Sequence, residues 1–314
     1  MRRLGTAALG AAALLGLAVA PRLLSSYYVG LLTQVLIYAI FAMSLDLLLG
    51  YTGLPSLGHA AYFGAAAYTL GLLAQRAGVG FWSALPWAVG AAAAAGALFA
   101  LLAIRVRGAY FLMITLALGQ VLWGIAFRWR ALTGGEDGIT GVPRPTLPGG
   151  TALSGSAGIH FFALAVFVAV GLALWVLVRS PFGLALRGIR GSETRMEALG
   201  YNVWAYKYLV SVIAAIVAGL AGVLFASYTG FVSPADLSIV TSARVLLMVL
   251  VGGAGTLAGP ALGAGAIVLL ESIVSTQVER WMSVLGAVYI LVVVLCPGGI
   301  VGVFQAARGK GALG

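Results

Sequence analysis

Long apolar runs recur along the chain, separated by short breaks that are polar or rich in glycine and proline. Most runs approach the roughly 20 residues that a helix needs to cross a bilayer. Because lipid offers the backbone no hydrogen-bond partners, such runs predict an all-α, polytopic transmembrane helical bundle of about nine or ten spans. The expected spans are 4-20, 29-49, 58-75, 84-104, 109-127, 159-178, 208-227, 241-253, 257-275 and 283-296.

Two parts of this pattern leave alternatives open. The run 241-275 is interrupted by a cluster of glycines and a proline, so it fits either two spans or one bent helix with a re-entrant piece. At the N-terminus, two arginines precede an apolar stretch that ends in Ala18-Val19-Ala20, which fits either a retained helix or a cleaved signal peptide. We expect a retained helix, with 1-28 as an N-terminal hydrophobic span.

Composition excludes a soluble protein. Of the 314 residues, 62% are hydrophobic and 8% are charged, against roughly 45–50% and about 25% in soluble domains. The 45 glycines are about twice the usual share, and small residues let membrane helices pack closely. The net charge of +10 lies mainly at the ends of the apolar runs, which indicates membrane topology, with lipid and no nucleic acid as a partner.

The positive charges also orient the predicted spans. With the N-terminus in the cytoplasm, 11 of the 18 Lys and Arg residues lie on the cytoplasmic side and 7 lie outside. This agrees with the excess of positive charge that membrane proteins carry in their cytoplasmic loops. It places the loop 179-207 and both termini in the cytoplasm, with 304-314 as a cytoplasmic tail.

The residues needed for metal or nucleophilic chemistry are scarce. Cys296 is the one cysteine, and His59 and His160 are too few for a zinc site or a histidine-based triad. No Gly-x-x-x-x-Gly-Lys-Ser/Thr sequence is present to bind a nucleotide phosphate. We therefore expect no catalytic residue, no metal site and no cofactor bound by this chain.

Two glycine-rich breaks, 49-60 and 252-260, predict unwound backbone. Inside a membrane such backbone is tolerated only where protein or a water-filled cavity satisfies its polar groups, and transporters use broken helices of this kind along their pathways. The alternative for 49-60 is a tight cytoplasmic turn. The candidate pathway residues in the two breaks are Gly53, Ser56, Gly58, His59, Gly253 and Gly255.

Three ionisable residues lie at or near the apolar spans. Charge inside a bilayer is costly, so a functional role is the default hypothesis for each of them. Asp46 and Glu271 are close to the ends of their spans, where a structural or interfacial role is the simpler interpretation. His59 directly follows the first break, and histidine is the residue type that can donate or accept a proton near neutral pH, which makes it the stronger candidate.

A short helix is predicted within the loop 179-207. Ser192 can cap its start, Glu193 suits its positive end, and Gly200 can end it in a left-handed conformation. Met196 and Leu199 are three residues apart, so we expect them to form one apolar ridge that faces a partner beyond the bilayer. The alternative is a helix that rests on lipid headgroups.

Several motifs resemble those of one family, in the same order along the chain. They are the segments 48-53, 56-64, 133-139, 195-209, 247-260 and 297-302. Together they resemble the LivM-type permease subunit of branched-chain amino acid ABC importers. One departure is Arg244, which stands where the family commonly has Glu.

The resemblance implies that 29-303 is a permease domain in the bacterial inner membrane, a transporter subunit and not an enzyme. The implied partners are a second, LivH-like permease, two cytoplasmic ATPases that bind ATP and Mg, and an extracytoplasmic amino-acid-binding protein. Branched-chain amino acids are the implied substrate, and the alternative substrates are urea, short amides or another small solute. The alternative class of protein is an ion-coupled secondary transporter. The implied ATPase-coupling residues are Arg195, Met196, Glu197, Ala198, Leu199 and Gly200.

The loop 128-158 is the one long extracytoplasmic segment in this topology. It is rich in glycine and proline, and its Glu136 and Asp137 can meet basic groups on another protein. We expect it to dock the binding protein. A simple connector is the alternative.

Overall fold

The computed structural model describes residues 2–106, 108–146, 153, 155–277, 283, 286–287 and 299–302. The predicted span 283-296 and the tail 304-314 therefore lie mostly or wholly outside the described residues. Within the described part the fold is all-α, as predicted, apart from one two-stranded ribbon in which β1 (Ile139–Thr140) pairs antiparallel with β2 (Phe231–Val232). The helices are α1 (Arg2–Leu23), α2 (Ser26–Thr52), α3 (His59–Ala77), α4 (Phe81–Ala103), α5 (Ala109–Arg128), α6 (Arg130–Thr133), η1 (Gly135–Asp137), α7 (Ser156–Arg179), α8 (Pro181–Gly191), α9 (Glu193–Ala198), α10 (Val203–Thr229), η2 (Pro234–Leu237), α11 (Ile239–Gly252) and α12 (Ala258–Gln277).

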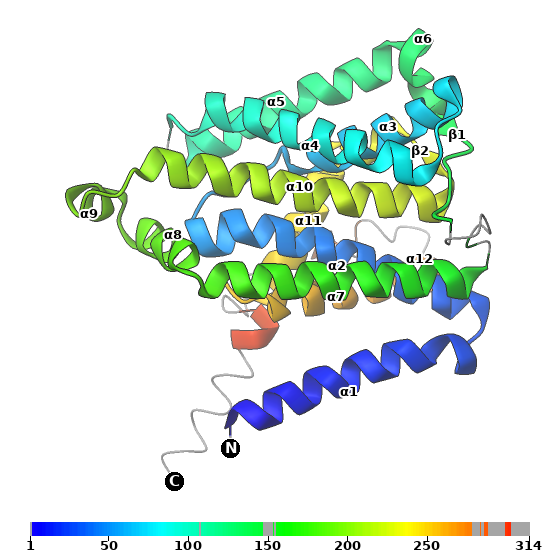
Figure 1. Ribbon diagram of the computed structural model, residues 1–314, viewed down its shortest axis with the longest axis horizontal. Coiled ribbons are helices and arrows are strands. Elements are labelled where there is room, and N and C mark those ends of the chain that lie inside the picture. Colours follow the sequence, from blue (N-terminus) through cyan, green and yellow to red (C-terminus); the bar gives the residue numbers. More distant parts are fainter. Residues whose placement is uncertain are drawn as a thin grey trace.

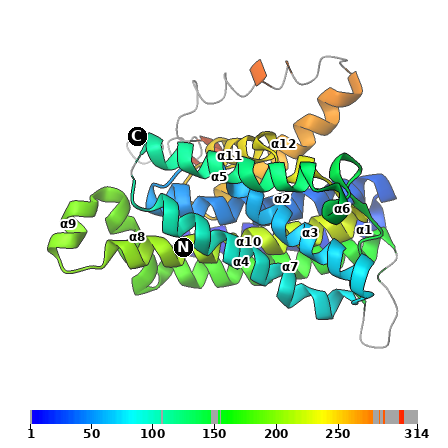
Figure 2. The ribbon, with the colours of Figure 1, turned by 90° about the horizontal axis from the view of Figure 1, so that it is seen from above.

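The long helices form a bundle with two distinct ends. In Figure 1, α2, α7 and α10 run side by side, with α8 and α9 beyond them on the left and the β1–β2 ribbon on the right. Figure 2 shows the same separation from above, with α8 and α9 at one end and α6 at the other. We call these the α9 end and the ribbon end.

The core lies between α2, α3, α4 and α10. In their most apolar stretches, 78% of the residues of α2 and 67% of those of α10 are buried, against 22–28% for α4, α5 and α7. The ring of Phe63 on α3 packs between Phe41 of α2 and Phe225 of α10, with ring centroids 4.6 and 5.5 Å apart. The two central helices therefore have protein on most sides, while the outer helices turn apolar faces outward.

Small residues allow the core helices to pack closely, as the glycine content predicts. Gly222 of α10 lies against the backbone of Phe63 in α3, and Gly219 lies against Ala92 of α4. Gly96 of α4 faces Ala215 of α10 in the same way. A larger side chain at any of these positions would force the helices apart, which is the usual reason for small residues at membrane helix interfaces.

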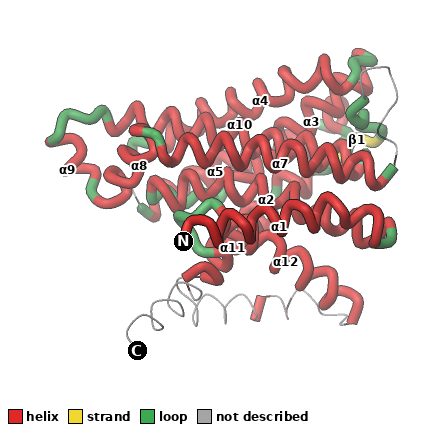
Figure 3. Tube along the Cα trace, turned by 60° about the horizontal axis from the view of Figure 1, so that its bottom comes forward, coloured by secondary structure: helices red, strands yellow, loops and turns green. Residues whose placement is uncertain are grey.

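Within the described residues, helices occupy the nine predicted positions from 4-20 to 257-275. By length and composition, six of the described helices can cross a membrane: α2, α4, α5, α7, α10 and α12. The α11 helix cannot, because its 14 residues extend only about 21 Å against a hydrocarbon core of about 30 Å. The run 241-275 therefore forms a short helix followed by a long one. Figure 3 shows most loops at the two ends of the bundle.

The N-terminal helix α1 is joined to the bundle by His160. This buried side chain on α7 contacts the carbonyl oxygen of Leu17 in α1 through Nε2, at 2.9 Å. Its Nδ1 lies 3.1 Å from the hydroxyl of Thr33 in α2. His160 therefore holds three helices together, which is a structural role.

Candidate functional site

The first glycine-rich break turns back into the bundle. α2 ends at Thr52, and Gly53 follows with a φ of 77°. His59 then opens α3 beside α2, with its Nε2 2.7 Å from the hydroxyl of Ser44 and its ring stacked on Phe41. Ser44 lies eight residues, or about 12 Å, before the end of α2. The predicted unwound segment is confirmed, and the alternative of a tight turn is wrong.

The unwound segment is held by α5. The backbone N–H of Leu57 donates to the hydroxyl of Thr115 at 3.3 Å. Gly58 lies against the carbonyl oxygen of Thr115, where no side chain fits. Two buried polar atoms of the segment, the hydroxyl of Ser56 and Nδ1 of His59, have no hydrogen-bond partner among the described residues. Both candidates therefore offer unused polar groups inside the bundle.

A second segment enters the bundle between β2 and α11, and sequence reasoning missed it. Leu237 of η2 packs against Gly64, five residues after the start of α3. The hydroxyl of Ser242 on α11 accepts a hydrogen bond from the N–H of Ala60 at 3.0 Å. The first turns of α3 and α11 therefore meet within the bundle. A signal was present in the sequence: Asp236 accepts a hydrogen bond from the N–H of Ser233 at 2.9 Å, which is half of a capping box.

The two glycine-rich breaks meet near the α9 end. Gly50 of α2 and Gly255 of the α11–α12 turn are in direct backbone contact. The carboxylate of Asp46 accepts a hydrogen bond from the N–H of Gly255 at 2.7 Å. The guanidinium of Arg190, on α8, donates to the carbonyl oxygen of Gly50 and lies next to Gly255. A single side chain of α8 thus touches both breaks, while Gly253 ends α11 with a φ of 110°.

The predicted short helix is present as α9, with its expected caps. The hydroxyl of Ser192 accepts from the N–H of Arg195 at 3.3 Å, and Gly200 has a φ of 85°. The expected apolar ridge is wrong, however. Met196 is 8% exposed and packs under α8 against Gly188, whereas Leu199 is 67% exposed. The surface at the α9 end is formed by Leu199 with Arg195, Glu197, Ala198 and Gly200.

An ion pair fixes α9 to α10. The ammonium group of Lys207 contacts the carboxylate of Glu193, the first residue of α9. Lys207 is 2% exposed, and a buried charge of this kind is stable only with a partner. α9 therefore has two anchors, Met196 on α8 and Glu193 on α10.

The loop after α5 covers the ribbon end. Its α6, η1 and β1 follow one another, and β1 is joined to the bundle through β2. The guanidinium of Arg76, at the end of α3, donates to the carbonyl oxygens of Ala131 and Leu132. Glu136 and Asp137 are exposed on η1. In its described residues the loop thus forms defined local structure, with its acidic pair facing outward.

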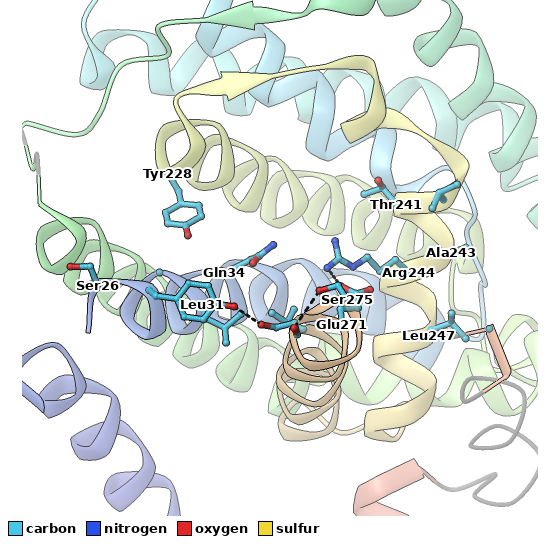
Figure 4. A pocket seen from close by; sticks show the side chains of 16 residues that line it. Ser26, Leu31, Gln34, Tyr228, Thr241, Ala243, Arg244, Leu247, Glu271 and Ser275 are labelled. Atoms are coloured by element: carbon cyan, nitrogen blue, oxygen red, sulfur yellow. Dashed lines mark hydrogen bonds and ion pairs between the residues drawn. The ribbon is translucent and has the colours of Figure 1, made fainter. Parts of the chain in front are cut away.

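A cavity of about 740 Å³ opens among α2, α10, α11 and α12 on the ribbon side. Figure 4 shows that Arg244 of α11 and Glu271 of α12 meet in its wall, with Gln34 and Tyr228 nearby. Arg244 forms an ion pair with Glu271 and donates to the hydroxyl of Tyr38 at 2.9 Å. Sequence reasoning singled out both charges but could not show that they are partners 27 positions apart.

These features define a class. Two helices of this polytopic bundle, α3 and α11, begin inside its membrane-spanning core. The helical pair of α8 and α9 lies at one end of the bundle and contacts both glycine-rich breaks. This is the architecture of a membrane permease. The chain belongs to the family of permease components of the branched-chain amino acid transport system, whose model matches residues 27–295. The chain is therefore a membrane transport subunit and not an enzyme.

Curated relatives agree with this assignment. The chain is 34% identical to the high-affinity branched-chain amino acid transport system permease protein LivM of Escherichia coli (strain K12) and 33% identical to that of Salmonella typhimurium. Each alignment covers 92% of this chain and 73% of the relative. A probable branched-chain amino acid transport permease protein LivM of Methanocaldococcus jannaschii is 28% identical over 56% of this chain and 51% of its own length. No solved structure matches the chain.

Proposed function

We propose that this chain is the LivM-type permease subunit of an ATP-driven importer for branched-chain amino acids. The observation that carries the proposal is Arg190, because it joins α8 directly to both glycine-rich breaks. A displacement of α8 and α9 would reach the interior of the bundle through rigid contacts. The chain has no phosphate-binding loop of its own, so the displacement must come from partner ATPases that bind ATP and Mg.

The proposed coupling surface is the exposed part of α9 and its C-terminal cap. It consists of Arg195, Glu197, Ala198, Leu199 and Gly200, with Met196 as the internal anchor that holds them in place. Two cytoplasmic ATPases would bind here and at the equivalent surface of a second, LivH-like permease. The α9 end and both termini would then be cytoplasmic, in the bacterial inner membrane.

The proposed substrate path runs past the first turns of α3 and α11. The candidate pathway residues of the first break are Gly53, Ser56, Gly58 and His59, and those of the second break are Gly253 and Gly255. The unpartnered hydroxyl of Ser56 and Nδ1 of His59 support this assignment, because buried polar atoms without partners are costly unless a ligand or water uses them. Residues 29-303 form the permease domain in this proposal, with 1-28 as an N-terminal span.

The ribbon end would receive the extracytoplasmic binding protein. Glu136 and Asp137 are exposed there on an ordered loop. Two exposed carboxylates offer basic groups on a partner an electrostatic contact, which mainly favours rapid and specific docking.

Reconstitution tests the proposal. Liposomes that hold this chain, the second permease and the ATPases should take up leucine only when ATP and the loaded binding protein are present. Uptake by this chain alone in a proton or sodium gradient would show a secondary transporter instead. Uptake of urea or short amides in preference to leucine would show another substrate within the same family.

A further inference from the structure

The cavity on the ribbon side exists because α11 is short. α11 begins at Ile239, next to the early turns of α3, so among the described residues no helix continues it into the space nearer the ribbon end. That space is lined by the first residues of α2, the last of α10 and the last turns of α12, among them Ser26, Tyr228 and Ser275. The cavity therefore extends from the ribbon end down to the middle of the bundle.

Its deeper wall carries one positive and one negative group. Arg244 is the sixth residue of α11, about 7.5 Å from the start of that helix, and Glu271 lies six residues, or about 9 Å, before the end of α12. Their side chains form an ion pair, and Arg244 also lies 4.4 Å from the centroid of the Tyr38 ring. Charges at this depth are expensive, which marks the pair as a functional candidate.

The rest of the lining divides into polar and aliphatic groups. Gln34, Thr241 and Ser272 add neutral hydrogen-bonding side chains near the ion pair. The aliphatic side chains in the lining come from α2, α11 and α12, and they are Leu31, Val240, Leu247 and Val268. A ligand that fits this lining has a small charged head and an aliphatic body.

We propose that this cavity is a binding site for an aliphatic α-amino acid in its zwitterionic form. The ligand carboxylate binds Arg244, the ligand ammonium binds Glu271, and the ligand side chain contacts Leu247 and Val268. When a zwitterion binds, its two charges replace the contact between Arg244 and Glu271 with two new ion pairs, so the cavity stays neutral. An anion or a cation would instead leave one protein charge unpaired in a medium of low dielectric constant. This inference rests on the proposed function, since it places the imported substrate on this chain.

Cysteine protection tests the site in the complete importer, without the binding protein. The chain carries Cys296→Ser and Val240→Cys, and maleimide labelling of Val240→Cys is followed by mass spectrometry. We expect leucine to slow the labelling. Leucinamide, which lacks the carboxylate, and 4-methylpentanoate, which lacks the ammonium, should not slow it at the same concentration. Thr140→Cys, exposed on β1, is the matched control and should label at the same rate in every case.

Charge removal gives a second measurement. Arg244→Gln and Glu271→Gln should each raise the leucine concentration for half protection by about tenfold or more, as the loss of a charged hydrogen bond implies. If either variant fails to assemble, the comparison of the three ligands decides without it.

Three results would overturn the site. The first is that leucine does not slow the labelling, and the second is that 4-methylpentanoate slows it as much as leucine does. The third is that Val240→Cys is labelled in the isolated chain but not in the importer, because the second permease would then cover the cavity. Normal ATP-driven leucine uptake beside any of these would leave the proposed function intact. Absence of uptake in the unmodified importer would overturn both proposals.

Discussion

The guanidinium of Arg190 lies where the backbone of α2 needs a donor. The last carbonyl groups of a helix have no partner within the helix and carry partial negative charge, so a cation is favoured there. Arg190 donates to the carbonyl of Gly50, two residues before α2 ends, and Arg187 of the same helix lies over the ring of Tyr51 at 5.1 Å. Two arginines one turn apart thus fasten α8 to the end of α2.

Replacing Arg190 by Gln should uncouple transport from ATP hydrolysis. The variant keeps a polar side chain but loses a charged hydrogen bond, typically about 1.5–3 kcal/mol. We expect ATP-driven uptake to fall about tenfold while the ATPases still co-purify, measured in proteoliposomes. The control is Arg179→Gln at the same end, whose guanidinium lies over Trp175 at 4.0 Å. Equal uptake by Arg190→Gln and Arg179→Gln would exclude this role.

Glycine at positions 53 and 58 should be required for different reasons. Gly53→Val places a branched residue in a left-handed conformation, at a cost of about 1–2 kcal/mol, and Gly53→Asn should be tolerated better. Gly58→Ala would press a methyl group against the carbonyl of Thr115, whereas nothing lies near the equivalent position at Gly80. We expect Gly53→Val and Gly58→Ala to lower uptake, and Gly53→Asn and Gly80→Ala to keep it. Uptake that is the same in all four variants would count against the break as a pathway element.

The α9 helix transmits force only if its two ends are fixed. Gly200→Val should misdirect the chain between α9 and α10, because Gly200 has a φ of 85°, and Gly200→Asn is the matched control. Glu197→Lys should reverse a charge on the proposed coupling surface without disturbing the Met196 anchor. We expect both Gly200→Val and Glu197→Lys to weaken ATPase co-purification and to lower ligand-stimulated ATP hydrolysis several-fold, with binding-protein affinity unchanged. A full ATPase complement in both would show that the ATPases bind elsewhere.

The sequence predicts the helices well, because the length of an apolar run can be read from neighbouring residues alone. It also predicts the break at 49-60, where three glycines and a proline separate two apolar runs, but it leaves a tight turn open as the alternative. It does not predict that α3 starts beside Ser44, because that depth depends on contacts between segments. The entry of residues 233–238 into the bundle was missed for the same reason: Leu237 is buried through its contact with Gly64, which its neighbours in sequence do not reveal.

The candidate site was predicted in part for similar physical reasons. Capping by Ser192 and Gly200 is local, and it was confirmed. The apolar ridge was wrong because spacing shows that Met196 and Leu199 are neighbours on a helix, but not which of them a second helix covers. The ion pair of Arg244 with Glu271 depends on how α11 and α12 align as a hairpin, so sequence could name the charges and not their pairing.

The loop at the ribbon end gives a prediction for the assembled importer. Asp137 is exposed on η1, in a loop held to the bundle by β1 and Arg76. A cross-linker on Asp137→Cys, in a Cys296→Ser background, should capture the loaded binding protein, whereas the same linker on Leu199→Cys at the opposite end should not. The yield should fall several-fold in high salt, because exposed charges are screened. An active importer that gives no cross-link from Asp137→Cys would exclude docking at this loop.

The meeting of α3 and α11 also bears on how the membrane stays sealed. Each helix carries roughly half a positive elementary charge at its N-terminus, and both N-termini lie within the bundle. Oriented half-helices of this kind form electrostatic barriers against protons and cations in other membrane pores. We therefore expect an idle importer to leak neither protons nor sodium while its path is hydrated, so that the cell keeps its ion gradients between rounds of import. Dye-loaded proteoliposomes measure this directly, and a proton leak above that of protein-free liposomes would contradict it.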